Sequence, residues 1–284
     1  GNPDGGEMII LLATPFMAQH ADAGLFWAKA LCEMGHSLVL WEYRLNPEPP
    51  KADYDFALIL KGESIDPTML KSPKVIYWPD AFERDPGIEA KLRLYDRVFT
   101  PVRPTPDWME WLPTGFDESI HRDLGLERRF PSIYMGTANS EYKVEMITKI
   151  NPSWLGGNGW ERYYARREKT IAPAVYLHEL VGILNQAKIL IDIHQSPTVG
   201  LNRKFFEMIA CGFTIVDEVP GVREILGDRL ADIVAFKNVE TAKNLIKYYL
   251  ENEKAREFAW NAEKEAIQPY TYRAATERVL KETE

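Results

Sequence analysis

The stretch SPTVGLNRKFFEMIACGFTIVDEVPGVREILG, residues 196–227, holds the pattern that decides the fold. Gly200 and Asn202 open a helix with one apolar side, and Gly212 suits the position after the last turn of this helix. Residues 213–216 form a short apolar run typical of a fully buried strand. A turn over residues 219–221 then starts a second helix. The stretch therefore reads as loop, helix, strand, loop and short helix.

Two charged residues near the start of this helix stand four positions apart. Arg203 and Glu207 therefore share one helix face. Arg203 lies in the first turn, where free backbone N–H groups and the helix dipole favour an anion, so a cation there needs an anionic partner. One turn later, Glu207 can accept hydrogen bonds from a pair of hydroxyls, and a phosphate followed by a ribose has this layout. The alternative is a surface Arg–Glu pair worth roughly a few tenths of a kcal/mol.

The segments FFEMIACGFTIV (205–216) and VPGVREIL (219–226) resemble the donor-site signature of GT-B glycosyltransferases. The similarity is to the family-4-like group, and within it to the spore-maturation-protein type. The resemblance implies that Glu207 binds the donor ribose and that Gly200, Leu201, Asn202 and Arg203 lie near the donor diphosphate. Many family-4 enzymes have another Glu eight positions before Glu207, and this chain has a valine there.

Length and composition allow one large or two medium domains, since the chain has 284 residues of which 45% are hydrophobic. There is no apolar run of about eighteen residues, and the first residues, GNPDGGE, lack the features of a signal peptide. We therefore expect a cytoplasmic protein without a membrane span. Cys32 and Cys211 are expected to be buried free thiols in a reducing compartment, and no zinc-site spacing is present.

The charge is unevenly distributed. The net charge is −8, and residues 1–123 hold 20 acidic and 12 basic residues, whereas residues 124–284 hold 22 of each. The acidic first half argues against a long nucleic-acid groove there. A local basic run (Arg162, Arg166, Arg167 and Lys169) is either a solvated helix face or an attractor for a phosphate-bearing partner.

The first part of the chain alternates strands and helices. We predict strands over residues 8–13, 37–42, 53–60, 74–78, 97–100 and 111–113, and helices over 23–34 and 85–94. Strand, helix and strand in succession favour a parallel sheet. The first loop lacks a Gly-x-Gly-x-x-Gly pattern. Asp53 and Asp55 precede their strand, which is the wrong end for a ligand site, so no metal site is predicted there.

Two residues of this part are candidates for acid–base chemistry. Asp80 follows the strand over residues 74–78 and therefore lies at its carboxyl end, where ligands bind in open α/β sheets. Its alternative role is that of a helix cap or turn acid. His20 follows the first strand and is a candidate base or acceptor contact, although a loop histidine is often simply solvated.

The second part repeats the pattern after a connection over residues 114–129. We predict strands over residues 132–135, 154–155 and 189–193, and helices over 140–150, 177–186, 239–252, 253–267 and 272–282. The resemblance implies two Rossmann-like domains facing each other across a cleft. Residues 1–118 would form the acceptor-side domain and residues 119–268 the donor domain. Residues 269–284 would form a helix that crosses back to the first domain.

The resemblance also implies how the donor diphosphate is held. Family-4 enzymes have an Arg and a Lys after the first strand of the second domain. The region here contains Gly136, Thr137 and Lys143, with Lys143 matching the Lys and Thr137 standing at the Arg position. Lys143 and Arg203 would stabilise the departing nucleoside diphosphate without a metal. His194 ends the strand before the opening stretch and points to the same edge.

These inferences favour a hexosyltransferase-like glycosyltransferase that is metal-independent and retains anomeric configuration. It would move a sugar from a UDP-sugar to a hydroxyl of a glycan, small molecule, protein or nucleic acid, without a further cofactor. The alternatives are a nucleotide-sugar epimerase on the same fold and a non-catalytic nucleotide-binding module. A phage-type DNA glycosyltransferase is a special case that the acidic first half disfavours.

Overall fold

The chain folds into two compact units. The computed structural model describes residues 6–15, 23–80, 85, 87–164, 171–198 and 200–282. The first unit comprises Gly1–Pro113 together with Tyr272–Glu284, and the second comprises Thr114–Thr271. His20 lies outside the described residues, as does most of the basic run, because Arg166, Arg167 and Lys169 fall within 165–170.

The first unit is built on a parallel six-stranded sheet in the order β2-β1-β3-β4-β5-β6. The chain leaves β1 for β2 and then crosses to the other side of β1, so the strand order reverses between β1 and β3. The elements are β1 (Ile9–Ala13), α1 (Gly24–Glu33), β2 (Ser37–Trp41), β3 (Phe56–Leu60), β4 (Lys74–Tyr77), α2 (Ile88–Leu92), β5 (Arg97–Thr100), β6 (Glu110–Trp111) and α10 (Tyr272–Lys281).

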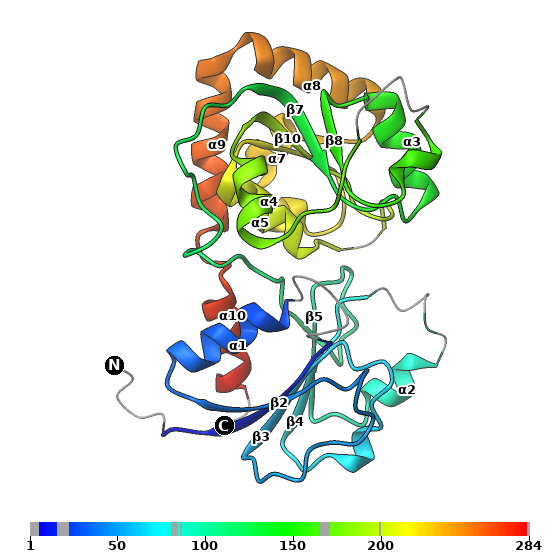
Figure 1. The fold of residues 1–284 in the computed structure, drawn as a ribbon, viewed down its shortest axis with the longest axis vertical. Coiled ribbons are helices and arrows are strands. Elements are labelled where there is room, and N and C mark those ends of the chain that lie inside the picture. Colours follow the sequence, from blue (N-terminus) through cyan, green and yellow to red (C-terminus); the bar gives the residue numbers. More distant parts are fainter. Residues whose placement is uncertain are drawn as a thin grey trace. The chain divides into compact units, whose positions relative to one another are not determined.

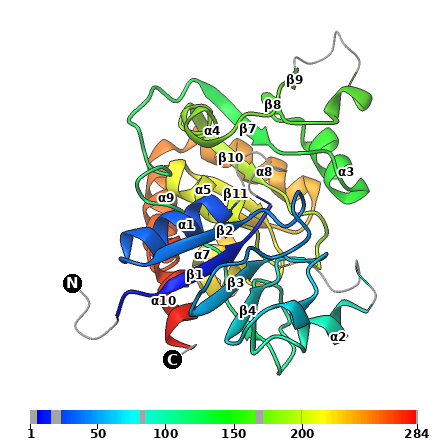
Figure 2. The same ribbon diagram turned by 60° about the horizontal axis from the view of Figure 1, so that its bottom comes forward.

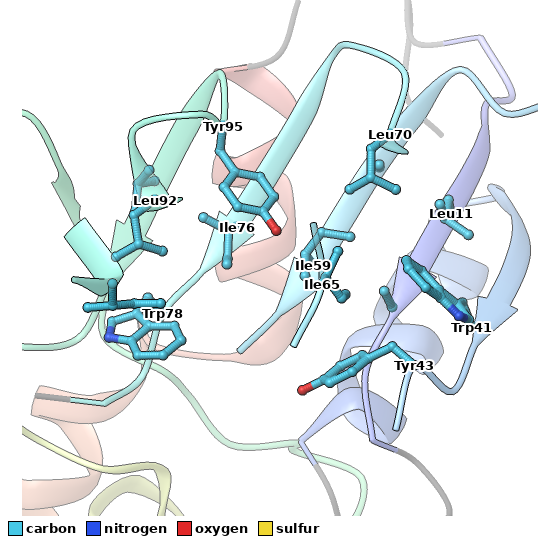
Figure 3. Close-up of a cluster of buried hydrophobic side chains, with 14 of the residues drawn as sticks. Leu11, Trp41, Tyr43, Ile59, Ile65, Leu70, Ile76, Trp78, Leu92 and Tyr95 are labelled. Atoms are coloured by element: carbon cyan, nitrogen blue, oxygen red, sulfur yellow. The ribbon is translucent and has the colours of Figure 1, made fainter. Parts of the chain in front are cut away.

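The central strands β1 and β3 are buried on both faces, which is why they are apolar throughout rather than alternating, whereas the edge strand β2 is partly exposed. One face carries a cluster in which side chains of the sheet meet Ile88 and Leu92 of α2 (Figure 3). The other face is covered by α1 and α10, which lie side by side in Figure 1. Phe26 stacks on Tyr272 with ring centroids 4.9 Å apart, and Trp27 packs against Tyr77 at 5.6 Å.

The second unit has its own parallel six-stranded sheet, in the order β12-β11-β10-β7-β8-β9. Taken from β7, this is the strand order of a dinucleotide-binding fold, with the reversal between β7 and β10. The neighbours β7, β10 and β11 run alongside one another in Figure 2. The strands are β7 (Phe130–Met135), β8 (Trp154–Gly156), β9 (Ile171–Ala172), β10 (Ala187–Asp192), β11 (Thr214–Asp217) and β12 (Ala235–Phe236).

Seven helices are described in this unit. They are α3 (Glu141–Ile150), α4 (Leu177–Leu184), α5 (Arg203–Cys211), α6 (Val222–Leu226), α7 (Asp228–Val234), α8 (Val239–Glu251) and α9 (Glu253–Ile267). The α/β class with two Rossmann-like sheets is thus confirmed. Helix α7 and strand β12 were not predicted. No helix within the described ranges is long and apolar enough to pass through a bilayer.

Gly212 directly follows the last residue of α5, as predicted, and its backbone is extended, with φ −175° and ψ 167°. A Cβ there would lie 2.8 Å from the Arg128 guanidinium and 3.1 Å from Leu190. The expectation of two buried cysteines was wrong for one of them. Cys211 is buried but Cys32 is exposed, because it lies on the outer side of α1.

The two connections between the units meet in a short bridge inside the second unit. Phe116 pairs with Thr271 in a parallel bridge, and the Phe116 N–H donates to the Tyr270 carbonyl. Gly115 makes this approach possible, because a Cβ there would lie 2.5 Å from the Tyr270 oxygen. Glycine is therefore required where the two segments touch.

Candidate functional site

The carboxyl edge of the second sheet carries the candidate site. Ligands of open α/β sheets bind outside the carboxyl ends of the strands, where the strand order reverses. In this unit the reversal lies between β7 and β10. Gly136 follows β7 directly, His194 follows β10 by two residues, and α5 begins at Arg203. The opening stretch of the sequence therefore lies at the switch point of the sheet.

The loop after β7 is fixed by close backbone contacts. The Gly136 N–H donates to the Gly156 carbonyl at 3.0 Å, and Trp160 Nε1 donates to the Gly136 carbonyl at 2.6 Å. Gly157 has φ +118°, and a Cβ there would lie 2.2 Å from the Gly136 oxygen. The turn is thus held in one conformation, with Thr137 exposed beyond it.

Helix α3 starts just after this turn. Ser140 caps it by accepting a hydrogen bond from the Lys143 N–H at 3.2 Å. The Lys143 side chain is buried, and its Nζ donates to Asn139 Oδ1 at 2.9 Å. The ammonium group of Lys143 thus places a positive charge beside the turn after β7, and this charge helps to lower the pKa of Asp192.

The amino end of α5 has no side-chain cap. Asn202 occupies the N-cap position with extended backbone, but its side chain makes no capping hydrogen bond. Its Oδ1 atom is buried and has no hydrogen-bond partner among the described residues. Gly200 and Leu201, which lead into the helix, are both buried. In the first turn the Phe205 N–H donates to the Asn202 carbonyl at 3.3 Å, and no side chain caps this end of the nine-residue helix, which is the kind of end that binds anions.

Glu207 lies one turn further along α5 and is nearly inaccessible, with 4% of its side chain exposed. Its Oε1 atom stands 3.7 Å from Arg203 Nη1 and 3.8 Å from His121 Nε2, and it has no hydrogen-bond partner in the described chain. Burial of Glu207 rules out a solvated surface pair. A buried carboxylate with unfilled acceptor capacity is costly unless a ligand supplies donors.

A network of buried charges lies beneath the amino end of α5. Lys204 Nζ forms an ion pair with Asp192 Oδ1 at 2.8 Å and stands 4.7 Å from the centre of the Tyr134 ring. Burial alone would lower the pKa of Lys204, but Asp192 outweighs it and raises that pKa. In the same way, Lys204 outweighs the effect of burial on Asp192 and lowers its pKa. Both groups are therefore charged at neutral pH.

His194 joins this network to β11. Its Nδ1 is 2.7 Å from Asp217 Oδ1, and its backbone N–H donates to the same carboxylate at 3.1 Å. The Nε2 atom accepts the Asn202 N–H at 3.4 Å and lies 3.9 Å from Asp192. Burial lowers the pKa of His194, but the two carboxylates outweigh it and raise the pKa. His194 thus ties the ends of β10 and β11 to the start of α5.

Nine of the eleven predicted site residues lie around this one edge. They are Gly136, Thr137, Lys143, His194, Gly200, Leu201, Asn202, Arg203 and Glu207. Asp80 is in the first unit, beyond the end of β4, where it forms an ion pair with Lys61 Nζ at 2.9 Å. His20 cannot be placed, since it lies outside the described residues. Among the residues that are described, no cluster of His, Cys, Asp or Glu has the arrangement of a metal site.

Sequence reasoning missed four charged or titratable residues of the site: His121, Asp192, Lys204 and Asp217. A signal existed for three of them. Asp192 and Asp217 end apolar strands, which is the position that singled out Asp80. Lys204 is a cation in the first turn of α5, just as Arg203 is. His121 had no such signal, because only the folded connection brings it within 3.8 Å of Glu207.

Comparison with known proteins agrees with this geometry. Residues 144–281 match the family model described as "Glycosyl transferase-like". No curated protein matches the sequence. Many solved structures share the fold. One is the DNA-modifying enzyme β-glucosyltransferase, studied with and without uridine diphosphoglucose, with TM-score 0.66, 13% identity and coverage of 97% of this chain and 98% of that chain.

Two further structures show how widely this fold is used. An α-glucosyltransferase in complex with UDP-glucose and DNA containing an abasic site has TM-score 0.61 and 11% identity, with coverage of 98% of this chain and 99% of that one. A glycosyltransferase involved in avilamycin A biosynthesis has TM-score 0.61 and 14% identity, covering 97% of both chains.

The class of the protein follows from these findings. The chain has the fold of the GT-B glycosyltransferases, with two parallel six-stranded sheets. Its glycosyl transferase-like sequence covers most of the second unit, which carries the candidate site, and continues into α10.

Proposed function

We propose that this protein is a glycosyltransferase that moves a sugar from a UDP-sugar to a hydroxyl acceptor, and that it belongs to the family-4-like, spore-maturation-type group. One observation carries the proposal. The switch point of the second sheet combines an uncapped helix start with a buried carboxylate, Glu207, whose hydrogen-bond capacity is unfilled. These two features fit the phosphate and the ribose of a nucleotide.

In this proposal the donor lies along the amino end of α5. The diphosphate accepts hydrogen bonds from backbone N–H groups at the start of the helix, and Arg203 and Lys143 supply positive charge. Glu207 accepts hydrogen bonds from the two ribose hydroxyls. Asp192, Lys204 and His194 do not touch the donor; they fix the helix start from beneath, so that little reorganisation is needed on binding.

The reaction breaks the bond between the anomeric carbon and the diphosphate oxygen, and forms a bond from that carbon to the acceptor oxygen. The acceptor hydroxyl loses its proton, and we propose Asp80 or His20 as the base. Negative charge grows on the departing diphosphate and is stabilised by the helix start and the two cations. We propose that no metal is required and that anomeric configuration is retained.

The similar solved structures support the donor more strongly than the acceptor. Several are complexes with UDP-glucose, and one T4 phage enzyme is complexed with UDP and Mn²⁺. Their acceptors differ, since one complex contains DNA and another enzyme serves avilamycin A synthesis. Residues 1–123 are acidic, with 20 acidic against 12 basic residues. We therefore favour an acceptor other than nucleic acid. We also propose that the reaction takes place in a reducing, cytoplasmic compartment.

The proposal is tested first by calorimetry with UDP, GDP, ADP and dTDP in EDTA. We expect UDP to bind. Glu207→Gln should weaken the affinity for UDP by about ten- to a hundredfold, because hydrogen bonds to a charged group are lost. Glu277→Gln is the matched control, because Arg273 and Glu277 form an exposed pair with the same four-residue spacing. If no nucleotide binds, or if both variants bind UDP alike, the site assignment is wrong.

Product analysis then separates the alternatives. A transferase joins the sugar of UDP-glucose to an acceptor, and NMR of the product reports its anomeric configuration. An epimerase would convert the sugar without an acceptor, and a binding module would show no turnover. DNA binding with a steep dependence on salt would favour a nucleic-acid acceptor instead.

A further inference from the structure

The segment that leads into the second unit places a histidine against the carboxylate of Glu207. His121 lies between β6 and β7, with 4% of its side chain exposed, and its Nε2 atom is 3.8 Å from Glu207 Oε1. His121 is anchored to its own segment, because its backbone N–H donates to the Asp117 carbonyl at 2.7 Å. The imidazole thus reaches α5 from a different part of the fold.

The hydrogen bond that His121 Nδ1 accepts determines the tautomer of the imidazole. The Asp117 backbone N–H donates to His121 Nδ1 at 3.1 Å. A backbone N–H can only donate, so Nδ1 must carry a lone pair, and a neutral ring then holds its proton on Nε2. Burial lowers the pKa of His121, and Arg203 adds to this effect against Glu207 and Asp117. At neutral pH the Nε2–H group therefore faces the carboxylate.

Arg203 approaches the same oxygen of Glu207 from within α5, at 3.7 Å. Both distances exceed that of a hydrogen bond, and catalytic contacts of this kind commonly shorten when a ligand binds. With two donors facing Oε1, the carboxylate has a preferred orientation. Its remaining acceptor capacity is then directed to a ligand rather than to the protein.

We propose that His121 is a positioning residue for Glu207, and that its Nε2–H group orients the carboxylate that distinguishes a nucleotide with a vicinal ribose diol from one without it. This inference rests on the proposed function, because Glu207 is taken to bind the ribose. It adds that the selectivity for the diol depends on a residue that does not touch the nucleotide.

Two substitutions test the roles of the two His121 nitrogens separately. In His121→Asn, the side-chain oxygen can replace Nδ1 as acceptor of the Asp117 N–H, but the donor toward Glu207 is lost. In His121→Gln, the amide nitrogen can replace Nε2 as donor, but the bond from the Asp117 N–H is lost. A structural role would make the Gln variant the worse one, whereas a positioning role makes the Asn variant the worse one.

The measurement is the ratio of affinities for UDP and 2′,3′-dideoxy-UDP. We expect the wild-type protein to prefer UDP by at least about tenfold. His121→Asn should lose most of this preference while its affinity for dideoxy-UDP stays unchanged, and His121→Gln should keep it. Equal preference in the wild-type and Asn proteins, or equal loss for both ligands, would overturn the inference.

A second measurement needs no nucleotide. Histidine ¹⁵N spectra at pH 7 should show the His121 signal, assigned by its loss in His121→Asn, with the shifts of the Nε2–H tautomer. An Nδ1–H tautomer would overturn the positioning role even if UDP binds well. If the protein shows the expected tautomer but binds no UDP, the proposed function is wrong, although the proton of His121 lies where it was inferred to lie.

Discussion

The carboxyl edges of the two sheets hold charged residues in opposite ways. In the first unit, Lys61 and Asp80 are 2.9 Å apart with side chains 31% and 30% exposed. In the second unit, Lys204 and Asp192 are 2.8 Å apart, but Asp192 is fully buried and Lys204 is 22% exposed. Similar separations thus occur with a partly exposed acid on one edge and a fully buried acid on the other.

This difference changes what each pair does. An exposed pair gains little and is screened, so its side chains adapt readily to a ligand. A buried pair must stay together, because either charge alone would be left without solvent or partner. The charged side chains of the second edge are therefore held in one arrangement before a ligand binds, which suits the nucleotide proposed above. The first edge suits a more variable ligand, in keeping with an acceptor.

The sharpest test of this contrast is Lys204→Met. The substitution leaves Asp192 buried without its cation, and we expect a loss of about 3 kcal/mol in the free energy of unfolding. Urea unfolding at pH 7 measures it. The double variant Lys204→Met/Asp192→Asn should recover most of the loss, because no buried charge then remains. A single variant as stable as the wild type would show that the buried pair is not what holds this edge.

A smaller effect is expected at Glu263 of α9, a buried acid that forms no ion pair with any residue that the structure describes. Its Oε2 accepts the Thr214 N–H at 3.1 Å, and its Oε1 has no hydrogen-bond partner within the described residues. Burial raises the pKa of Glu263 well above its usual value. Folding then takes up a proton, so this group makes stability fall as pH rises above about 4.5.

Glu263→Gln should remove this pH dependence. We expect the variant to be more stable than the wild type by at least about 1 kcal/mol at pH 8, and nearly equal to it near pH 4.5. Thermal unfolding across this range measures the difference. Glu265→Gln, on the exposed side of the same helix, is the control and should change little. A variant that is less stable at pH 8 would contradict the expectation.

The smallest effect on stability is expected at the first edge. Asp80→Asn breaks the pair with Lys61, and the free energy of unfolding should change by less than about 1 kcal/mol. If Asp80 is the base, turnover should fall by about a hundredfold or more. Lys61→Met tests the pair from its other side and should leave more activity. Full turnover in Asp80→Asn would leave His20 as the remaining candidate.

Much of the fold follows from short-range patterns in the sequence. Buried strands such as Phe56–Leu60 are apolar throughout, and helices such as Glu253–Ile267 are bounded by clear breaks, so both were predicted closely. The helix end at Gly212 was also predicted, but the close approach of Arg128 and Leu190 to this glycine was not. Such contacts join residues distant in sequence, and periodicity does not reveal them.

The same distinction between contacts close in sequence and contacts distant in sequence applies to the candidate site. Arg203 and Glu207 are neighbours on one helix, so their spacing alone indicated a shared face. Lys204 and Asp192 are twelve positions apart, and His121 and Glu207 are 86 apart, so each pair exists only once the sheet has formed. Sequence reasoning located the helix start correctly as a candidate, but not the buried groups that support it.

The return of α10 to the first unit has a consequence for how the chain is made. Phe26 and Trp27 pack on Tyr272, which the ribosome adds almost 250 residues later. The second unit, Thr114–Thr271, is by then complete. During synthesis the part of the first sheet that α10 covers therefore stays open until the inserted second unit has been made, whereas α1 is present from the start. The unit that begins first is therefore the last to be completed.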